Sequence, residues 1–248
     1  MRWLLSVLGV MVAGVALAQT DNPCQVGDGI LQPSFPLTRV AAAIVAKKLD
    51  IIVVGTSSSA LTGFGGTGKT YPARFQADLK KMLPDVAVRV TTYARPRQTA
   101  PDMVKAIEQG IARDKPALVV WQSGTADAIR GIDPDEFSAA LDEGVASAVA
   151  GNADVILMNM QYSPRTEAMI ALTPYLEVMR FVALQHEIDL FDRYAVMKYW
   201  SEVGTFDFSV ATKKTDLAER VHACIGELLT SFVLESAKLT PSTQENAQ

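Results

Sequence analysis

The chain has 248 residues, 49% of them hydrophobic, and a net charge of −4 at pH 7. This length suffices for one sizeable core, and α/β domains reach it as single units. The mildly acidic balance and the lack of a basic patch argue against nucleic acid as a partner. Two scattered histidines and two cysteines do not supply a first-row metal site, so we expect neither a metal nor another cofactor.

The first 18 residues have the organisation of a secretory signal peptide. Arg2 supplies a positive charge, residues 3–15 are apolar, and Ala16-Leu17-Ala18 is a small-residue cleavage site. The apolar stretch is shorter than the roughly 20 residues that a spanning helix needs. We expect a periplasmic or secreted protein without a membrane span after cleavage; an uncleaved membrane anchor is the alternative.

An irregular N-terminal arm is predicted over residues 19–38, where prolines and glycines interrupt any regular element. Cys24 lies in this arm, and Cys224 lies in the last predicted helix. In an exported chain, two cysteines favour a disulfide, which would tie the arm to that helix. Two separate thiols are the alternative.

After the arm, apolar periodicity predicts alternating helices and strands. In chain order they are a helix over 40–48, a strand over 50–54, a helix over 72–83, a strand over 86–91, a helix over 100–113, a strand over 117–121, a helix over 134–149, a strand over 153–160, a helix over 174–186, a strand over 189–192, and helices over 195–202 and 216–235. Such βαβ units build a parallel sheet. We expect one domain over residues 39–239 with a three-layer α/β/α sandwich and a five-stranded, mainly parallel sheet. The polar residues 240–248 are predicted to be a disordered tail.

The strand over 50–54 runs directly into Gly55, Thr56 and three serines, Ser57, Ser58 and Ser59. In open α/β sheets the chemistry lies just past the carboxyl ends of the strands. The serines are therefore candidate nucleophiles, which need a neighbouring base to take the hydroxyl proton.

A second motif follows the serines, because residues 63–70 match the P-loop pattern. In a P-loop the pattern leaves its strand directly, whereas eight residues separate residue 63 from the strand here. We interpret the segment as a glycine-rich loop beside the site and keep nucleotide binding as a distant alternative.

The sequence resembles the SGNH/GDSL hydrolase superfamily in blocks that follow in order. Gly55-Thr56-Ser57 is similar to the family's Gly-Asp-Ser, whose serine is the nucleophile, with Thr56 in place of the aspartate. The resemblance covers most of the mature chain and implies an SGNH-hydrolase-like or flavodoxin-like fold. It also implies that Ser57 is the nucleophile.

Two further blocks resemble the parts of that family that hold the oxyanion. Gly124-Thr125-Ala126-Asp127 is similar to Gly-x-Asn-Asp, with Ala126 in place of the asparagine. In the loop after residue 91, Ala94 or Arg95 takes the position of an oxyanion glycine. The resemblance therefore implies an oxyanion site formed by the N–H group of Ser57 with Ala94 or Arg95 and Thr125 or Ala126.

The family's Asp-x-x-His block should precede the last helix, but the corresponding Asp207 is not followed by a histidine. Glu219 and His222 form a glutamate variant of that spacing, in which the acid would hold the imidazole while its other nitrogen faces the serine. If the helix starts near residue 221, His222 reaches the site. If it starts near residue 216, His222 lies on the helix surface.

The resemblance implies a serine esterase that acts on an acyl or acetyl ester, with an envelope polysaccharide as one carrier of that ester. The partner would then be a small molecule or a glycan ester. The alternative function is a catalytically degenerate binding or accessory protein of the cell envelope. The family's asparagines are absent both at Ala126 and in the loop after residue 91, and this absence, with the missing Asp-x-x-His, favours that alternative.

Overall fold

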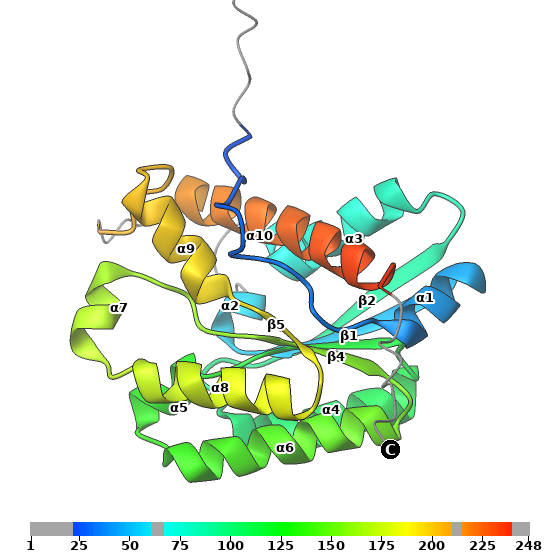
Figure 1. The fold of residues 1–248 in the computed structure, drawn as a ribbon, viewed down its shortest axis with the longest axis horizontal. Helices are drawn as coiled ribbons and strands as arrows, with labels where there is room; N and C mark the ends of the chain where they lie inside the picture. The colour runs from blue at the N-terminus through cyan, green and yellow to red at the C-terminus, as the bar shows by residue number, and fades with distance from the viewer. Residues whose placement is uncertain (1–21, 61–66, 210–214, 240–248) are drawn as a thin grey trace, which may run out of the picture.

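Five strands form a single parallel sheet at the centre of the structure, a computed structural model that describes residues 22–60, 67–209 and 215–239 (Figure 1). The strand order is β2-β1-β3-β4-β5, and all four strand pairs are parallel. The strands are β1 (Lys48–Gly55), β2 (Ala87–Ala94), β3 (Leu118–Gln122), β4 (Asp154–Met158) and β5 (Asp189–Phe191). The predicted five-stranded parallel sheet is confirmed.

Helices cover both faces of this sheet, which gives the expected three layers (Figure 1). One face carries α1 (Thr38–Val45), α3 (Tyr71–Met82), α9 (Arg193–Glu202) and α10 (Thr215–Ser236). The other carries α4 (Ala100–Asp114), α6 (Pro134–Ala150) and α8 (Thr173–Gln185). Four short elements complete the described part: α2 (Ser57–Ala60), η1 (Thr67–Lys69), α5 (Thr125–Arg130) and α7 (Pro164–Met169).

The strands are apolar because helices cover the sheet on both faces. Ile51 and Val53 of β1 pack in the core beneath α3 and α10, whereas Ile52 and Val54 pack in the core beneath α4 and α6. Successive side chains of a strand point to opposite faces, so a strand covered on both faces must be apolar throughout.

The predicted long elements are all present, with ends that differ by a few residues. Asp133 caps α6 as expected, since its side chain accepts a hydrogen bond from the N–H of Asp135. Helix α9 begins at Arg193, two residues earlier than predicted, because the Asp192 side chain caps it through the N–H of Ala195. The four short elements were not predicted, because three to six residues are too few for a periodic pattern.

The predicted disulfide is confirmed: Cys24 is bonded to Cys224, 200 residues later in the chain. It fixes an arm that contains no helix or strand over residues 22–37. The indole N–H of Trp200 also donates to the carbonyl of Gln25, at 2.9 Å. The arm is therefore held against α9 and α10.

No helix in the described ranges is long and apolar enough to cross a membrane. The predicted signal peptide over 1–18 and the predicted tail over 240–248 lie outside the described residues.

Candidate active site

The carboxyl ends of β1, β2 and β3 lie side by side at one edge of the sheet. Gly55 pairs with Ala94 of β2, and Val54 pairs with Trp121 of β3. The connections that leave β1 and β3 run to opposite faces of the sheet, toward α3 and α6. Ligands of open parallel sheets bind at such a switch point.

Residues 56–59, which we call the serine turn, are held together by the side-chain amide of Gln122 at the end of β3. Its Oε1 accepts hydrogen bonds from the N–H of Thr56 at 3.3 Å, from Ser58 Oγ at 3.0 Å and from Ser59 Oγ at 3.2 Å. A Cβ atom on Gly55 would lie 2.3 Å from Ser59 Oγ, so only glycine fits before this turn. The buried Thr56, which replaces the family's aspartate, is thus a structural part of the turn.

The three serines of the turn differ in accessibility. Ser59 is buried and its hydroxyl lies 2.9 Å from the hydroxyl of Tyr71, and Ser58 is half-buried. Ser57, the first residue of α2, is exposed, and its side chain forms no hydrogen bond with the described part of the chain. Ser57 therefore carries the most accessible hydroxyl of the three serines.

His222 lies within α10, which begins at Thr215, and its side chain points into the protein. Its Nδ1 accepts a 2.9 Å hydrogen bond from the N–H of Tyr71. Burial lowers the pKa of His222 to about 3, and the positive charge of Arg193 adds to this effect. In the neutral ring with Nδ1 as acceptor, the proton is on Nε2. That nitrogen is then a donor and does not accept a serine proton.

The structure does not form the predicted contact between Glu219 and His222. The carboxylate of Glu219 instead forms an ion pair with Lys69 of η1, at 2.5 Å. The expectation that Glu219 orients His222 is thus corrected, because a cation from another segment takes the carboxylate. Helix α10 starts at Thr215, yet the alternative that such a start would place His222 on the helix surface is also wrong, since only 5% of its surface is exposed.

The P-loop interpretation is weakened by the same ion pair. Lys69 is the lysine of that pattern, and in a P-loop it contacts the phosphates. Here its ammonium group is engaged by Glu219. Residues 63–66, the glycine-rich part of the pattern, lie outside the described residues.

The predicted oxyanion residues lie at the same edge of the sheet as Ser57. Ala94 ends β2 beside Gly55, and Ala94 and Arg95 line a pocket of about 610 Å³ between β2 and α4. Thr125 and Ala126 form the start of α5, just after β3. The structure thus brings these positions to the same end of the sheet as Ser57.

Asp127 and Gly124 shape the turn between β3 and α5. The fully buried carboxylate of Asp127 accepts hydrogen bonds from the N–H groups of Gly124 at 3.1 Å and Ala100 at 2.6 Å. Burial raises the pKa of Asp127 above its usual value. Gly124 has a φ of +98°, and a Cβ atom there would lie 2.9 Å from Met160. Both residues thus fix the backbone beside the site.

Arg193, at the start of α9, is a site residue that the sequence did not reveal. It is 1% exposed, and its Nη1 donates to Ser58 Oγ at 3.1 Å. Its Nη2 donates to Gln161 Oε1 at 3.4 Å, and its guanidinium carbon lies 5.8 Å from the ring centre of Tyr71. The available signal was its position just after the strand over 189–192, at the same sheet edge as the serines.

The placement of the serine turn at the end of β1 agrees with the protein family to which the chain is similar. The model of the Non-GDSL lipase-like family matches residues 23–239. The chain belongs to this family. Membership in a lipase-like family supports an esterase- or lipase-type function, and the predicted resemblance to SGNH/GDSL hydrolases is confirmed.

Solved structures show the same fold as this Non-GDSL lipase-like chain. LAE5, an alpha/beta hydrolase enzyme from the metagenome of Lake Arreo in Spain, is similar with a TM-score of 0.60 and 22% identity, over 76% of this chain and 96% of that one. The lipase/acylhydrolase from Enterococcus faecalis has a TM-score of 0.59 and 19% identity, over 78% and 98%. A putative lipolytic protein of the G-D-S-L family from Desulfitobacterium hafniense has a TM-score of 0.58 and 17% identity, over 74% and 98%. A comparison with curated proteins found no significant match.

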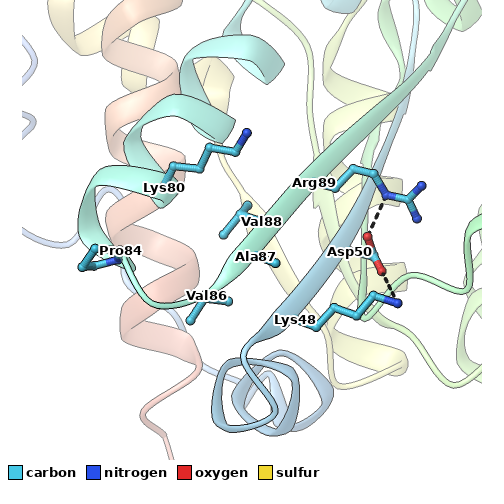
Figure 2. Close-up of a pocket in the computed structure, with 8 residues that line it drawn as sticks. All are labelled: Lys48, Asp50, Lys80, Pro84, Val86, Ala87, Val88 and Arg89. Carbon is cyan, nitrogen blue, oxygen red and sulfur yellow. Dashed lines mark hydrogen bonds and ion pairs between the residues drawn. The ribbon is translucent and has the colours of Figure 1, made fainter.

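A second hollow of the lipase-like domain lies at the opposite end of β1 (Figure 2). This pocket of about 770 Å³ is lined by the first residues of β1 and β2. Lys80 of α3 and Pro84, in the loop between α3 and β2, complete the lining. Asp50 forms ion pairs there with Arg89 at 2.7 Å and Lys48 at 3.4 Å. Because it lies at the amino ends of the strands, it is not the candidate active site.

Within the described ranges, no group of three or more His, Cys, Asp or Glu side chains is arranged to hold a metal ion.

Proposed function

We propose that this Non-GDSL lipase-like protein is an exported ester hydrolase in which Ser57 receives the acyl or acetyl group of the substrate. The observation that carries the proposal is the exposed position of Ser57 directly after β1, at the switch point of the sheet. The adjacent ends of β2 and β3 supply the backbone groups that would hold the oxyanion.

The proposed reaction begins with attack of Ser57 Oγ on the ester carbonyl carbon. The alcohol leaves with the serine proton, and water then releases the acyl group as a carboxylic acid. Because His222 presents a protonated Nε2, we expect this chemistry to be slow. Hydrolases that lose a triad member keep roughly 10³–10⁴-fold acceleration over water through oxyanion stabilisation and binding.

Export is part of the proposal and is supported by the Cys24–Cys224 bond, since disulfides persist in oxidising compartments. We propose an ester on an envelope polysaccharide as the first substrate to examine. Mass spectrometry of the protein from a periplasmic or secreted fraction should show a chain that begins at Gln19. A full-length chain in the cytoplasm would contradict export.

A second function, ligand binding without turnover, is favoured by one specific observation. The lone pair of His222 Nδ1 is taken by the N–H of Tyr71, so the described arrangement contains no free imidazole base for Ser57. On this alternative the serine turn holds an ester or anion without reacting.

One experiment separates the two functions. The wild-type protein and the variants Ser57→Ala and Ser58→Ala are treated with a fluorophosphonate probe and assayed with p-nitrophenyl acetate. The esterase proposal expects labelling and hydrolysis that disappear in Ser57→Ala and persist in Ser58→Ala. Absence of labelling in the wild type supports the binding function, and loss only in Ser58→Ala would move the nucleophile to Ser58.

A further inference from the structure

The guanidinium group of Arg193 is a buried positive charge whose contacts within the described ranges are all with neutral groups. Its two hydrogen bonds go to Ser58 Oγ and Gln161 Oε1. Its Nε is buried and has no hydrogen-bond partner in the described residues. Buried charges in proteins are normally paired with an opposite charge, so this arrangement requires an explanation.

No carboxylate of the described residues forms an ion pair with Arg193. The neighbouring Asp192 is occupied by Asn159 Nδ2 at 2.7 Å, by the N–H of Ala195 at 2.9 Å and by Arg180 Nη2 at 3.0 Å. Among the described residues, no nearby acid therefore compensates the positive charge beneath the serine turn.

This charge persists at neutral pH and acts on its surroundings. Burial lowers the pKa of Arg193 only to about 10, so the group remains protonated. The same charge contributes to the low pKa of the His222 imidazole. Its influence thus reaches the groups around the serine turn.

Ser58 connects this charge to the surface. Its hydroxyl accepts a hydrogen bond from Arg193 Nη1, and the residue before it in the chain is the exposed Ser57. A ligand on the outer side of these two serines is separated from the guanidinium by about one side chain. At roughly 6 Å and an effective dielectric constant of about 20, one full charge alters affinity by ten-fold or more.

We propose that Arg193 makes the serine turn selective for ligands that carry a negative charge, a carboxylate or a phosphate, beside the ester group. The proposal rests on the site assigned under the proposed function and adds the class of substrate. Arg193 acts through Ser58 and is a specificity-determining residue, because it does not itself reach the surface.

The preference for anions can be tested by the binding of small probes of similar size, with no need for turnover. Isothermal titration calorimetry would compare hexanoate and hexylphosphonate, which are anionic, with the neutral hexanamide, using the full mature chain. We expect hexanoate and hexylphosphonate to bind the wild type at least ten-fold more tightly than hexanamide. A clear advantage of one anion over the other would identify the carboxylate or the phosphate as the ligand.

Three variants locate the source of the preference. Arg193→Met removes the charge while leaving an apolar side chain in the buried space, and should abolish the preference. Arg193→Lys keeps the charge and should retain part of it. Lys48→Gln removes one exposed charge at the far end of β1, about 23 Å from Gly55 at 3.3 Å per residue, and should leave the preference unchanged.

The proposal is overturned if the wild type binds all three probes equally, if it binds none of them up to millimolar concentration, or if folded Arg193→Met keeps the preference. Should Arg193→Met fail to fold, the wild-type comparison and Arg193→Lys decide. Failure of the esterase proposal remains distinguishable, because Ser57→Ala removes acylation but should keep the preference for anions.

Discussion

The backbone N–H of Tyr71 donates a hydrogen bond to Nδ1 of His222 and thereby joins the start of α3 to the middle of α10. The two rings also lie 5.9 Å apart. This contact makes His222 a neutral, buried acceptor that stabilises the packing of the two helices. Its consequence can be measured as a dependence of stability on pH.

Acidification should destabilise the wild type through His222. Its pKa falls from 6.5 to about 3 on folding, so the unfolded chain binds the extra proton between those values. The stabilisation is complete above about pH 6.5 and is lost as the pH falls toward 3. Over the full window the loss is about 5 kcal/mol at most. Urea unfolding at steps between pH 7 and pH 3 measures it.

The variant His222→Phe should show a flatter decrease in the free energy of unfolding over this range than the wild type. The matched control His186→Gln removes the other histidine, whose Nε2 lies 2.8 Å from Asp142 Oδ1 in the opposite layer. An unchanged slope in His222→Phe would show that His222 titrates normally in the folded protein.

Glu219→Gln should have little effect on ester hydrolysis, because its carboxylate contacts Lys69 and not His222. The ion pair is partly exposed, with 24% of the Glu219 side chain and 42% of the Lys69 side chain accessible. Such a pair contributes about 1 kcal/mol or less. A double-mutant cycle with Lys69→Met measures this coupling, and kcat/KM for p-nitrophenyl acetate measures the effect on the reaction. A hundred-fold loss of kcat/KM would restore Glu219 to a catalytic role.

Gly124→Ala should destabilise the protein by about 1–3 kcal/mol, because the new Cβ meets Met160 at 2.9 Å and the backbone has a φ of +98°. Gly131→Ala is the matched control. Gly131 also has a positive φ, +65°, but a Cβ there meets no atom within 4 Å. Thermal unfolding should therefore show a larger decrease in Tm for Gly124→Ala. Equal decreases would mean that the backbone angle alone sets the cost.

Removal of the disulfide should lower stability by up to roughly 5 kcal/mol, the loop-entropy value for so long a loop. The variant Cys24→Ala/Cys224→Ala and the reduced wild type should unfold at similar urea concentrations, both well below the oxidised wild type. Addition of dithiothreitol to the double variant is the control and should change nothing. A reduced wild type as stable as the oxidised protein would show that the arm is held by its other contacts alone.

Much of the fold could be predicted because its signals are local. The apolar run of β1 is visible in a few residues, and the chemistry of parallel sheets places the site at its end. The resemblance to the SGNH/GDSL hydrolases singled out Ser57 among the three serines, and in the structure Ser57 is the exposed one. The disulfide could be predicted because the chain offers only one possible pair.

The contacts around the serine turn could not be predicted because they join distant parts of the chain. Gln122 reaches Ser58 across 64 positions, and Arg193 reaches the same hydroxyl across 135. Buried arginine is also rare, so composition gives no reason to place Arg193 in the core. The short spacing between Glu219 and His222 led to a wrong prediction of contact between them. The partner of Glu219 is Lys69, which lies 150 positions away in the chain.

The bond between Cys24 and Cys224 also sets an order of events for a chain that crosses a membrane from its N-terminus. Cys24 emerges early, whereas its partner emerges 200 residues later, within the final helix. The native pair can close only after nearly the whole domain has been delivered. On the proposed export route, Cys24 is until then an unpaired thiol in an oxidising compartment, open to mixed disulfides with other proteins. Native pairing on this route therefore depends on keeping Cys24 available until Cys224, in the last described helix, has been delivered.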